Sequence, residues 1–299
     1  MTTLLSEQMR GDLDLLCQRM NGDMTLVGLV PGSRKAYVNG VRKLTAHYGL
    51  LPDRLTEQQV RDYFLYLKND KQGASGTLSV VFSGIKFLYT HTVPRDWKTL
   101  KMVRVPRQKT LPDVLTIEEV RRLIDAIRKP HLKTFFWTVY SLGLRLNEGV
   151  HLHVGDIDSQ RMLVHVHLGK GSKDRYMPLP TRTLSMLRQH WLTHRHALWL
   201  FPIQRRRYGR RACVVGPMDR STPQIALSRV AKELNIRKQV SVHTLRHSYA
   251  THLLEAGVNL RLIQHYLGHT SLKATMIYLH VTSLGQERAR SLIEGVMAE

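Results

Sequence analysis

The sequence predicts a mainly helical protein of the α+β class, with two domains and one small β-sheet. Three observations predict this fold class. Apolar residues recur at steps of three and four through the first hundred of the 299 residues, a period typical of helices. A polar, basic stretch with two prolines separates the two halves near residue 105. The clearest strand pattern is a pair of short segments between residues 162 and 179, joined by a Gly-Lys-Gly-Ser turn.

The first predicted domain covers residues 1–104 and is helical. One of its helices has two contrasting sides, an apolar stripe and a basic flank. The stripe consists of Tyr37, Val38, Val41, Leu44 and Tyr48, and the flank of Arg34, Lys35, Arg42 and Lys43. For this helix taken alone, a solvated face without a partner explains the basic flank equally well.

Helix-start signals mark the next element and the start of the second half. Thr56 and Gln59 have the spacing of a capping box. Residues 111–116 repeat residues 51–56 almost one for one and are again followed by a cap partner, Glu119. Convergent helix-start chemistry is favoured over duplication, because the likeness fades within about two turns. The interdomain linker is expected at residues 105–112.

The second predicted domain covers residues 113–299. Helices are expected at residues 116–127 and 135–142, followed by the strand pair 162–168 and 174–179. Three short helices then follow in quick order, at about 244–256, 260–267 and 272–279. Helical spacing also extends over residues 283–297, which could pack on their own domain or dock elsewhere.

The charge balance indicates a polyanionic partner. Lys and Arg number 45 and Asp and Glu number 23, which gives a net charge of +22 and a pI near 10.4. The excess is present in both halves, with 17 basic and 9 acidic residues before residue 110 and 28 and 14 after it. Basic side chains set against phosphates release condensed counterions, so nucleic acid is the favoured ligand. An inert basic surface, or a ribosomal or membrane-surface role, is the alternative.

Other classes are disfavoured by composition. The chain has two cysteines, Cys17 and Cys213, which cannot build a disulfide framework or a four-cysteine zinc site. It has no apolar run of about 20 residues and no signal-peptide pattern at its start. We therefore expect a cytoplasmic protein without a membrane partner.

Residues 243–278 include side chains suited to cleaving a phosphodiester bond. Such cleavage needs a nucleophile, fixed cations on the nonbridging oxygens, and an acid for the leaving oxygen. His243 and Arg246 lie one turn apart at the start of a helix, so they point the same way. His269 follows a helix end, and Tyr278 comes nine residues later.

Five sequence blocks, in order and spacing, resemble the signature blocks of the tyrosine recombinase (phage integrase) family, in its Xer-like or transposon-encoded branch. The likeness covers roughly residues 110–285, and the N-terminal helices resemble the family's core-binding domain more weakly. A single block such as His-x-x-Arg occurs often by chance, but five in order are specific. The blocks are Tyr140–Glu148, Gly169–Arg175, His243–Ser248, Leu267–His269 and Tyr278.

The resemblance implies a role for each matching residue. Arg145 and Arg246 would clamp the scissile phosphate, and Lys170 would protonate the leaving 5′ oxygen. His243 would act as acid or base toward the Tyr278 hydroxyl, His269 would hydrogen-bond the phosphate, and Glu148 would orient its neighbours. Tyr278 would attack and hold the 3′ end as a phosphotyrosine. The expected contacts to DNA are Arg34, Lys35, Arg42, Lys43, Lys86, Lys173, Arg175, Arg205, Arg206 and Arg207.

The resemblance also implies an assembly. Two domains would form a C-shaped clamp on double-stranded DNA that carries a specific recombination site. Four protomers would exchange strands through a Holliday junction, with residues 283–297 docking on a neighbouring protomer, and no cofactor would take part. A type IB topoisomerase and a non-catalytic DNA-binding regulator are the competing functions. Integration or excision of a mobile element and Xer-like resolution are both open roles.

Two departures from the family pattern fall near the first arginine. Leu142 stands where the family usually has Thr or Ser, and Asn147 where it usually has Ser. Both positions support the loop in the family, so activity is still expected. Lys173 is a second candidate for the acid, because it lies in the same turn as Lys170.

Two further patterns carry weaker hypotheses. His165 and His167 share a strand face, and His151 and His153 repeat that spacing. No carboxylate or cysteine is expected at ligand spacing with them, so the sequence predicts no metal site and disfavours a metal-dependent nuclease. Residues 205–211 are the densest basic run and are expected to form a loop in contact with phosphate.

Overall fold

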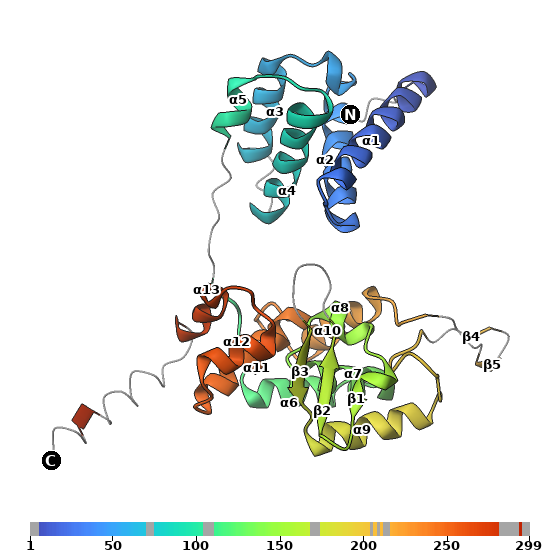
Figure 1. Cartoon of the computed structure of the whole chain (residues 1–299), viewed down its shortest axis with the longest axis vertical. Helices are drawn as coiled ribbons and strands as arrows, with labels where there is room; N and C mark the ends of the chain where they lie inside the picture. Colours follow the sequence, from blue (N-terminus) through green and yellow to red (C-terminus); the bar gives the residue numbers. More distant parts are fainter. Residues whose placement is uncertain are drawn as a thin grey trace. The chain divides into compact units, whose positions relative to one another are not determined.

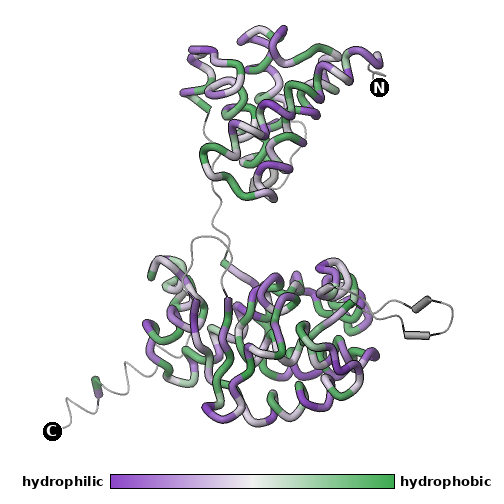
Figure 2. Tube along the Cα trace, turned by 45° about the vertical axis from the view of Figure 1, so that its right-hand side comes forward, coloured by the Kyte–Doolittle hydropathy of each residue, from purple (hydrophilic) through white to green (hydrophobic). Residues whose placement is uncertain are grey.

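The computed structural model describes residues 6–69, 75–103, 111–167, 174–203, 206–207, 210–211, 216–280 and 293–294. The chain divides into two compact units, Met1–Thr110 and Leu111–Glu299. Hydrophobic and hydrophilic residues alternate along the helices of both units (Figure 2). In the described residues no helix is long and apolar enough to span a bilayer.

The first unit is a bundle of helices around one large core and a smaller apolar cluster (Figure 1). α2 and α4 pack closely against each other, and Gly40 and Gly84 allow their backbones to approach. A Cβ on Gly84 would lie 2.8 Å from the Cα and carbonyl oxygen of Tyr37. The elements are α1 (Glu7–Leu26), α2 (Pro31–Tyr48), η1 (Pro52–Arg54), α3 (Glu57–Asn69), α4 (Ser75–Phe87), the π-helix η2 (Leu88–Thr92) and α5 (Lys98–Met102).

The second unit packs helices around a three-stranded antiparallel sheet, and the fold class that the sequence predicts is confirmed. The strand order is β1-β2-β3, and Val166 of β2 pairs with Arg175 of β3. The helices are α6 (Ile117–Asp125), α7 (Pro130–Ser141), α8 (Leu146–Val150), η3 (Val154–Asp156), α9 (Thr181–Leu192), α10 (Ser221–Glu233), α11 (Val242–Glu255), α12 (Leu260–Leu267), α13 (Leu272–Thr275) and η4 (Met276–His280). The strands are β1 (Ile157–Asp158), β2 (Leu163–Val166), β3 (Arg175–Pro178), β4 (Arg206–Arg207) and β5 (Arg210–Arg211).

Three elements differ from the sequence-based expectation. The helix expected at 272–279 is one α-helical turn, α13, followed by the 3-10 helix η4. The basic run expected as a loop contains a two-residue antiparallel pairing of β4 with β5. The sheet gains a third strand, β1, because two residues after η3 pair with β2. A two-residue strand is too short to show alternation, so the sequence carries no sign of it.

Candidate active site

Four segments of the second unit carry those expected catalytic residues that the structure describes. Arg145 is the N-cap of α8, and Arg246 lies on α11. Gly143, with φ +58°, turns the chain between α7 and α8, and a Cβ there would lie 2.3 Å from the ring of Tyr249. Gly268 ends α12 in the left-handed conformation, directly before His269.

Glu148 organises the arginines. One carboxylate oxygen accepts from the Arg145 guanidinium at 2.7 Å, and the other accepts from the Arg145 backbone N–H at 2.8 Å. Arg175 binds both oxygens, at 3.1 and 2.8 Å, and Arg246 lies 3.7 Å away. Burial alone would raise the pKa of Glu148, but hydrogen bonds and charge from Arg175, the Arg145 N–H and the Arg246 charge lower it to about 2. The carboxylate is therefore ionised at neutral pH.

Arg246 is almost fully buried, at 1% exposed. It donates to the carbonyl oxygens of Gly143, at 2.8 Å, and Leu267. Burial, followed by the charge of Arg145, lowers the pKa of Arg246 to about 9, so the guanidinium stays charged at neutral pH. The side chain of Arg145 is 34% exposed and also donates to the Gly268 carbonyl at 3.3 Å. Three guanidinium groups share the carboxylate of Glu148, and the positive excess favours an anionic ligand.

Three histidines lie in the field of these arginines. Burial and the charges of Arg246 and Arg145 lower the pKa of His243 below its ordinary value, and the same causes lower that of His269 to about 4. Burial, the His243 ring and Arg246 lower the pKa of His247 to about 4. The imidazoles of His247 and His269 are therefore neutral at neutral pH. His269 Nδ1 lies 3.0 Å from the Thr275 hydroxyl, which fixes the orientation of the ring.

Tyr278 lies on η4 and is 1% exposed. Its hydroxyl is 3.0 Å from Nδ1 of His247. Burial raises the pKa of Tyr278, and the charges of Arg246 and Arg145 oppose that rise. The structure thus gathers Tyr278 and both arginines in one electrostatic neighbourhood, although the segments that carry Arg145 and Arg246 are about a hundred residues apart.

The histidine that contacts the hydroxyl is His247, to which the sequence gives no role. The sequence instead assigns His243 to Tyr278, and the His243 ring lies beside His247 with 4.5 Å between centroids. The sequence does contain a signal for His247. It is four residues after His243, and residues four apart on a helix share a face. The choice between the two depends on the packing of η4 on α11, which sequence spacing does not give.

Arg175 requires a correction, because the sequence places it on the DNA backbone. The structure leaves it 2% exposed. Its Nε donates to the Tyr266 carbonyl at 2.6 Å, and its two terminal nitrogens bind Glu148. The guanidinium is therefore committed to the interior, where it supports Glu148.

The other expected DNA contacts are spread over both units. In the first unit Lys35, Lys43 and Lys86 are exposed, Arg42 pairs with Asp14 at 2.7 Å, and Arg34 is half-buried against Thr25. Lys170, Lys173 and Arg205 lie outside the described residues. Arg206 and Arg207 form β4, but the described structure does not extend to their side chains. Of the segment 283–297, only residues 293–294 are described.

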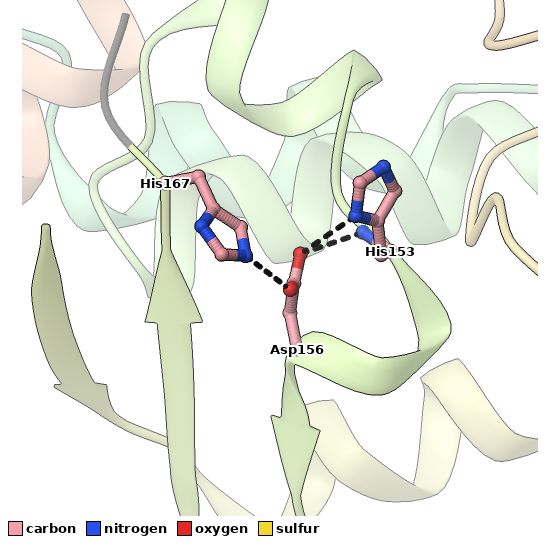
Figure 3. Close-up of side chains that lie close together, drawn as sticks. All are labelled: His153, Asp156 and His167. Atoms are coloured by element: carbon pink, nitrogen blue, oxygen red, sulfur yellow. Dashed lines mark hydrogen bonds and ion pairs between the residues drawn. The ribbon is translucent and has the colours of Figure 1, made fainter.

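The expectation that no carboxylate lies near the paired histidines was wrong. Asp156 lies between His153 and His167 (Figure 3), and Asp174 lies beside His165 and His167. The sequence hides this arrangement, because the η3 turn and the strand pairing bring together residues that are not at a regular ligand spacing.

Comparison with known proteins matches each of the two units to a family model. Residues 113–284 match the Phage integrase family, and residues 16–99 match the Phage integrase, N-terminal SAM-like domain. The integrase/recombinase-type protein y4qK of Sinorhizobium fredii is 35% identical over 269 residues, covering 90% of this chain and 85% of the relative. A tyrosine recombinase of Thermosipho africanus is 33% identical over 258 residues, covering 83% and 88%.

A solved structure supports the fold. The Tn1549 transposon integrase in complex with transposon right end DNA aligns with a TM-score of 0.66 and 18% identity, covering 92% of this chain and 98% of that one. The relatives and the family match agree with the resemblance found in the sequence. The chain therefore belongs to the phage integrase family and is a tyrosine recombinase, an enzyme that breaks and rejoins DNA.

Proposed function

We propose that this protein is a site-specific recombinase in which Tyr278 attacks a DNA phosphodiester and holds the 3′ end as a phosphotyrosine. The observation that carries the proposal is the Tyr278 hydroxyl, 3.0 Å from a neutral histidine and under the influence of the Arg246 and Arg145 charges. A phosphate bound to these arginines would lie within the same cluster as the nucleophile.

Arg145 and Arg246 are the proposed phosphate ligands. Their charges would neutralise the equatorial oxygens as the pentacoordinate phosphorus forms. His269 would donate to the phosphate, since a Thr275 hydroxyl that donates to Nδ1 leaves the ring proton on Nε2. Glu148 and Arg175 would hold the two arginine ligands in place without touching DNA.

His247 is the proposed acceptor of the phenolic proton, with His243 beside it as a second acid or base. With its ring proton on Nε2, His247 accepts from the Tyr278 O–H through Nδ1, which is the geometry of a general base. In the free enzyme its pKa is low because the ring is buried and because it lies near His243 and Arg246. A bound phosphodiester adds a negative charge to the site and raises the pKa of nearby imidazoles. Proton transfer to His247 would thus be favoured when DNA is bound.

The chemical steps balance without a cofactor. Tyr278 oxygen forms a bond to phosphorus while the bond to the 5′ oxygen breaks, and Lys170 (or Lys173) gives that oxygen its proton. A 5′ hydroxyl from a partner strand then attacks the phosphotyrosine and regenerates Tyr278. Each step replaces one phosphodiester by another, so neither a nucleotide nor a metal is required for energy.

Double-stranded DNA is the proposed partner, supported by the net charge of +22 and by the DNA-bound Tn1549 integrase of the same fold. Residues 1–104 would bind DNA, through Lys35, Arg42, Lys43 and Lys86, and residues 113–299 would carry out catalysis, aided by Arg205, Arg206 and Arg207. The two domains would close on the duplex as a C-shaped clamp at the nucleoid. Four protomers would exchange strands through a Holliday junction, each lending residues 283–297 to a neighbour, for integration and excision or for Xer-like resolution.

A nicked suicide duplex tests the proposal. The binding site is first selected from random duplexes and mapped by footprinting, and a nick is then placed so that cleavage releases a short 5′-hydroxyl fragment. We expect a detergent-resistant protein–DNA adduct that Tyr278→Phe lacks and that the control Tyr176→Phe, an exposed tyrosine on β3, retains. Absence of any adduct would favour a non-catalytic regulator.

Strand exchange separates recombination from relaxation. Two unnicked duplexes of different length, each with the mapped site, should yield recombinant lengths and a four-way intermediate. Relaxation of supercoiled plasmid without any recombinant product would favour the type IB topoisomerase function. Running the adduct assay with a chelator tests whether cleavage needs a metal.

A further inference from the structure

A second cluster of titratable side chains lies at the end of β2, and none of its members belongs to the candidate active site. Figure 3 shows its centre, in which Asp156 points between His153 and His167. Asp156 Oδ1 is 2.8 Å from Nε2 of His167, and Oδ2 is 4.0 Å from Nδ1 of His153. The three potential ligand atoms all lie within 4.8 Å of one another.

Asp156 is the buried element of this cluster, with 6% of the residue exposed. Its carboxylate accepts the backbone N–H of His153 at 2.8 Å across the η3 turn. This hydrogen bond aims the carboxylate at the end of β2 and fixes its position. A buried carboxylate is costly unless a cation or donors compensate its charge, so the local fold creates a demand for positive charge.

His167 sharpens that demand, because both of its ring nitrogens face carboxylates. Nε2 lies 2.8 Å from Asp156, and Nδ1 lies 3.5 Å from Oδ2 of Asp174. A neutral imidazole has one N–H, so the second nitrogen turns a lone pair toward a carboxylate oxygen. A metal cation bound to Nε2 resolves the conflict, because the ring N–H can then stay on Nδ1 and face Asp174.

We propose that His153, Asp156 and His167 bind one divalent transition-metal ion, with Zn²⁺ as the best match. Two imidazoles and a carboxylate are a donor set that zinc accepts and that calcium and magnesium, which prefer oxygen ligands, do not. Zinc bonds of about 2.0–2.2 Å place neighbouring ligand atoms roughly 3.3 Å apart in a tetrahedron. The observed separations of 2.8 and 4.0 Å to Asp156 lie on both sides of that spacing.

A second trio, His165, His167 and Asp174, overlaps the first through His167. Its carboxylate is the weaker anchor, because the side chain of Asp174 is 53% exposed and that of Asp156 is 6% exposed. We therefore assign the ion to the trio of Asp156. Asp174 then faces the remaining nitrogen of His167 at 3.5 Å and orients the ring, as carboxylates beside metal-binding histidines commonly do.

The proposed ion would join η3 to the end of β2. His167 directly follows β2 and comes three residues before Lys170, so the site lies close in sequence to the proposed general acid. Metal binding to the folded state alone stabilises that state by mass action. We expect Zn²⁺ to raise the Tm of the full chain by several degrees.

Cobalt titration tests the site directly. Full-length protein without a histidine tag is titrated with Co²⁺ at pH 7.5, and the visible absorption of the bound ion is recorded. We expect one ion per chain, displaced by Zn²⁺, with binding lost in His167→Gln and in His153→Gln. The control His151→Gln removes a neighbouring histidine that hydrogen-bonds the Asn147 carbonyl and belongs to neither trio, and it should bind as the wild type does.

Two further results decide the remaining alternatives. His165→Gln should retain the ion, and binding that requires His165 but survives His153→Gln would overturn the assignment to this trio. Absence of saturable Co²⁺ and Zn²⁺ binding at pH 7.5 would overturn the site. Circular dichroism of each variant, with the Zn²⁺-dependent Tm shift, separates loss of a ligand from loss of folding. These outcomes are independent of the suicide-duplex adduct, which tests Tyr278.

Discussion

The two halves of the candidate active site are built in different ways. The arginine cluster joins α8, β3 and α11 and consists of Arg145, Arg175, Arg246 and Glu148. Its guanidinium groups donate to the backbone carbonyls of Gly143, Tyr266 and Gly268. Tyr278 lies on a five-residue 3-10 helix that follows a single α-helical turn. Its hydroxyl is held by His247, and its ring by a small apolar cluster.

This difference suggests separate roles for the two halves: the arginine cluster would be in place before DNA binds, and Tyr278 would act after it. A buried ionic network keeps its geometry without a ligand, so the arginine cluster, which we propose binds the phosphate, can be preorganised and lower the barrier electrostatically. In the proposed mechanism the Tyr278 hydroxyl, in a residue that is 1% exposed, would move to meet a phosphate bound at the arginines. Short 3-10 segments have poorer hydrogen-bond geometry than α-helices and cost less to rearrange. We therefore expect changes in the arginine cluster to lower stability and activity together, and changes around Tyr278 to lower activity alone.

The largest expected effect on stability follows from removing the charge of Glu148. Glu148→Gln keeps the shape of the side chain but leaves three guanidinium groups without a counterion. Removing one partner of a buried ion pair costs about 3–5 kcal/mol. Urea denaturation, with linear extrapolation to water, measures the free energy of unfolding.

A matched surface variant provides the control. Glu233 forms an exposed pair with Arg128 at 3.5 Å, so Glu233→Gln should change the free energy of unfolding by about 0–1 kcal/mol. If Glu148→Gln costs no more than this control, Glu148 does not organise the arginine cluster and the comparison between the two halves fails.

Acid unfolding sharpens the same point. The folded state lowers the pKa of Glu148 from 4.5 to about 2, so its stabilising contribution is complete above pH 4.5 and is lost as the pH falls through 2. That shift corresponds to about 3 kcal/mol. The lowered pKa values of His247 and His269 give a separate loss between pH 6.5 and 4, which Glu148→Gln retains. The difference in unfolding free energy between wild type and variant should therefore shrink below pH 4.5, and a constant difference down to pH 2 would contradict it.

The sequence predicted the parts of this site whose spacing is local. His243 and Arg246 share a helix face, and His269 follows the glycine that ends α12. Such relations are set by one helix or one turn, so a motif preserves them. The fold class was accessible for the same reason, because helical periods and turn residues are local signals.

The parts that the sequence missed depend on tertiary packing. Arg175 looked like a surface cation, but it reaches Glu148 across 27 residues from the start of β3. The contact of His247 with Tyr278 spans 31 residues and depends on how η4 packs on α11. Asp156 meets His167 only because η3 ends beside β2. These contacts join residues that are far apart in the sequence, so no local residue pattern predicts them.

A smaller effect, confined to activity, is expected at the Tyr278 half. His247→Gln removes the proposed base and should slow adduct formation about 10²-fold, while the free energy of unfolding stays within about 1 kcal/mol of wild type. Rapid-quench measurement on the suicide duplex gives the rate. His265→Gln, at an exposed histidine of α12, should leave the rate unchanged. If His243→Gln slows the adduct and His247→Gln does not, the base is His243, as the sequence predicts.

The smallest expected effect is that of substituting Gly268, which contacts the arginine cluster and directly precedes His269. Gly268 has φ +59°, and a Cβ there would lie 3.0 Å from Nη1 of Arg175. Gly268→Ala should therefore cost about 1–2 kcal/mol of unfolding free energy through backbone strain and a shifted guanidinium. Gly155→Ala is the control, because no atom lies within 4 Å of its Cβ position. Since the Gly268 carbonyl also accepts from Arg145, a shift there should slow adduct formation as well as destabilise the fold. Destabilisation with an unchanged rate would mean that the arginine cluster tolerates displacement and that its geometry does not limit catalysis.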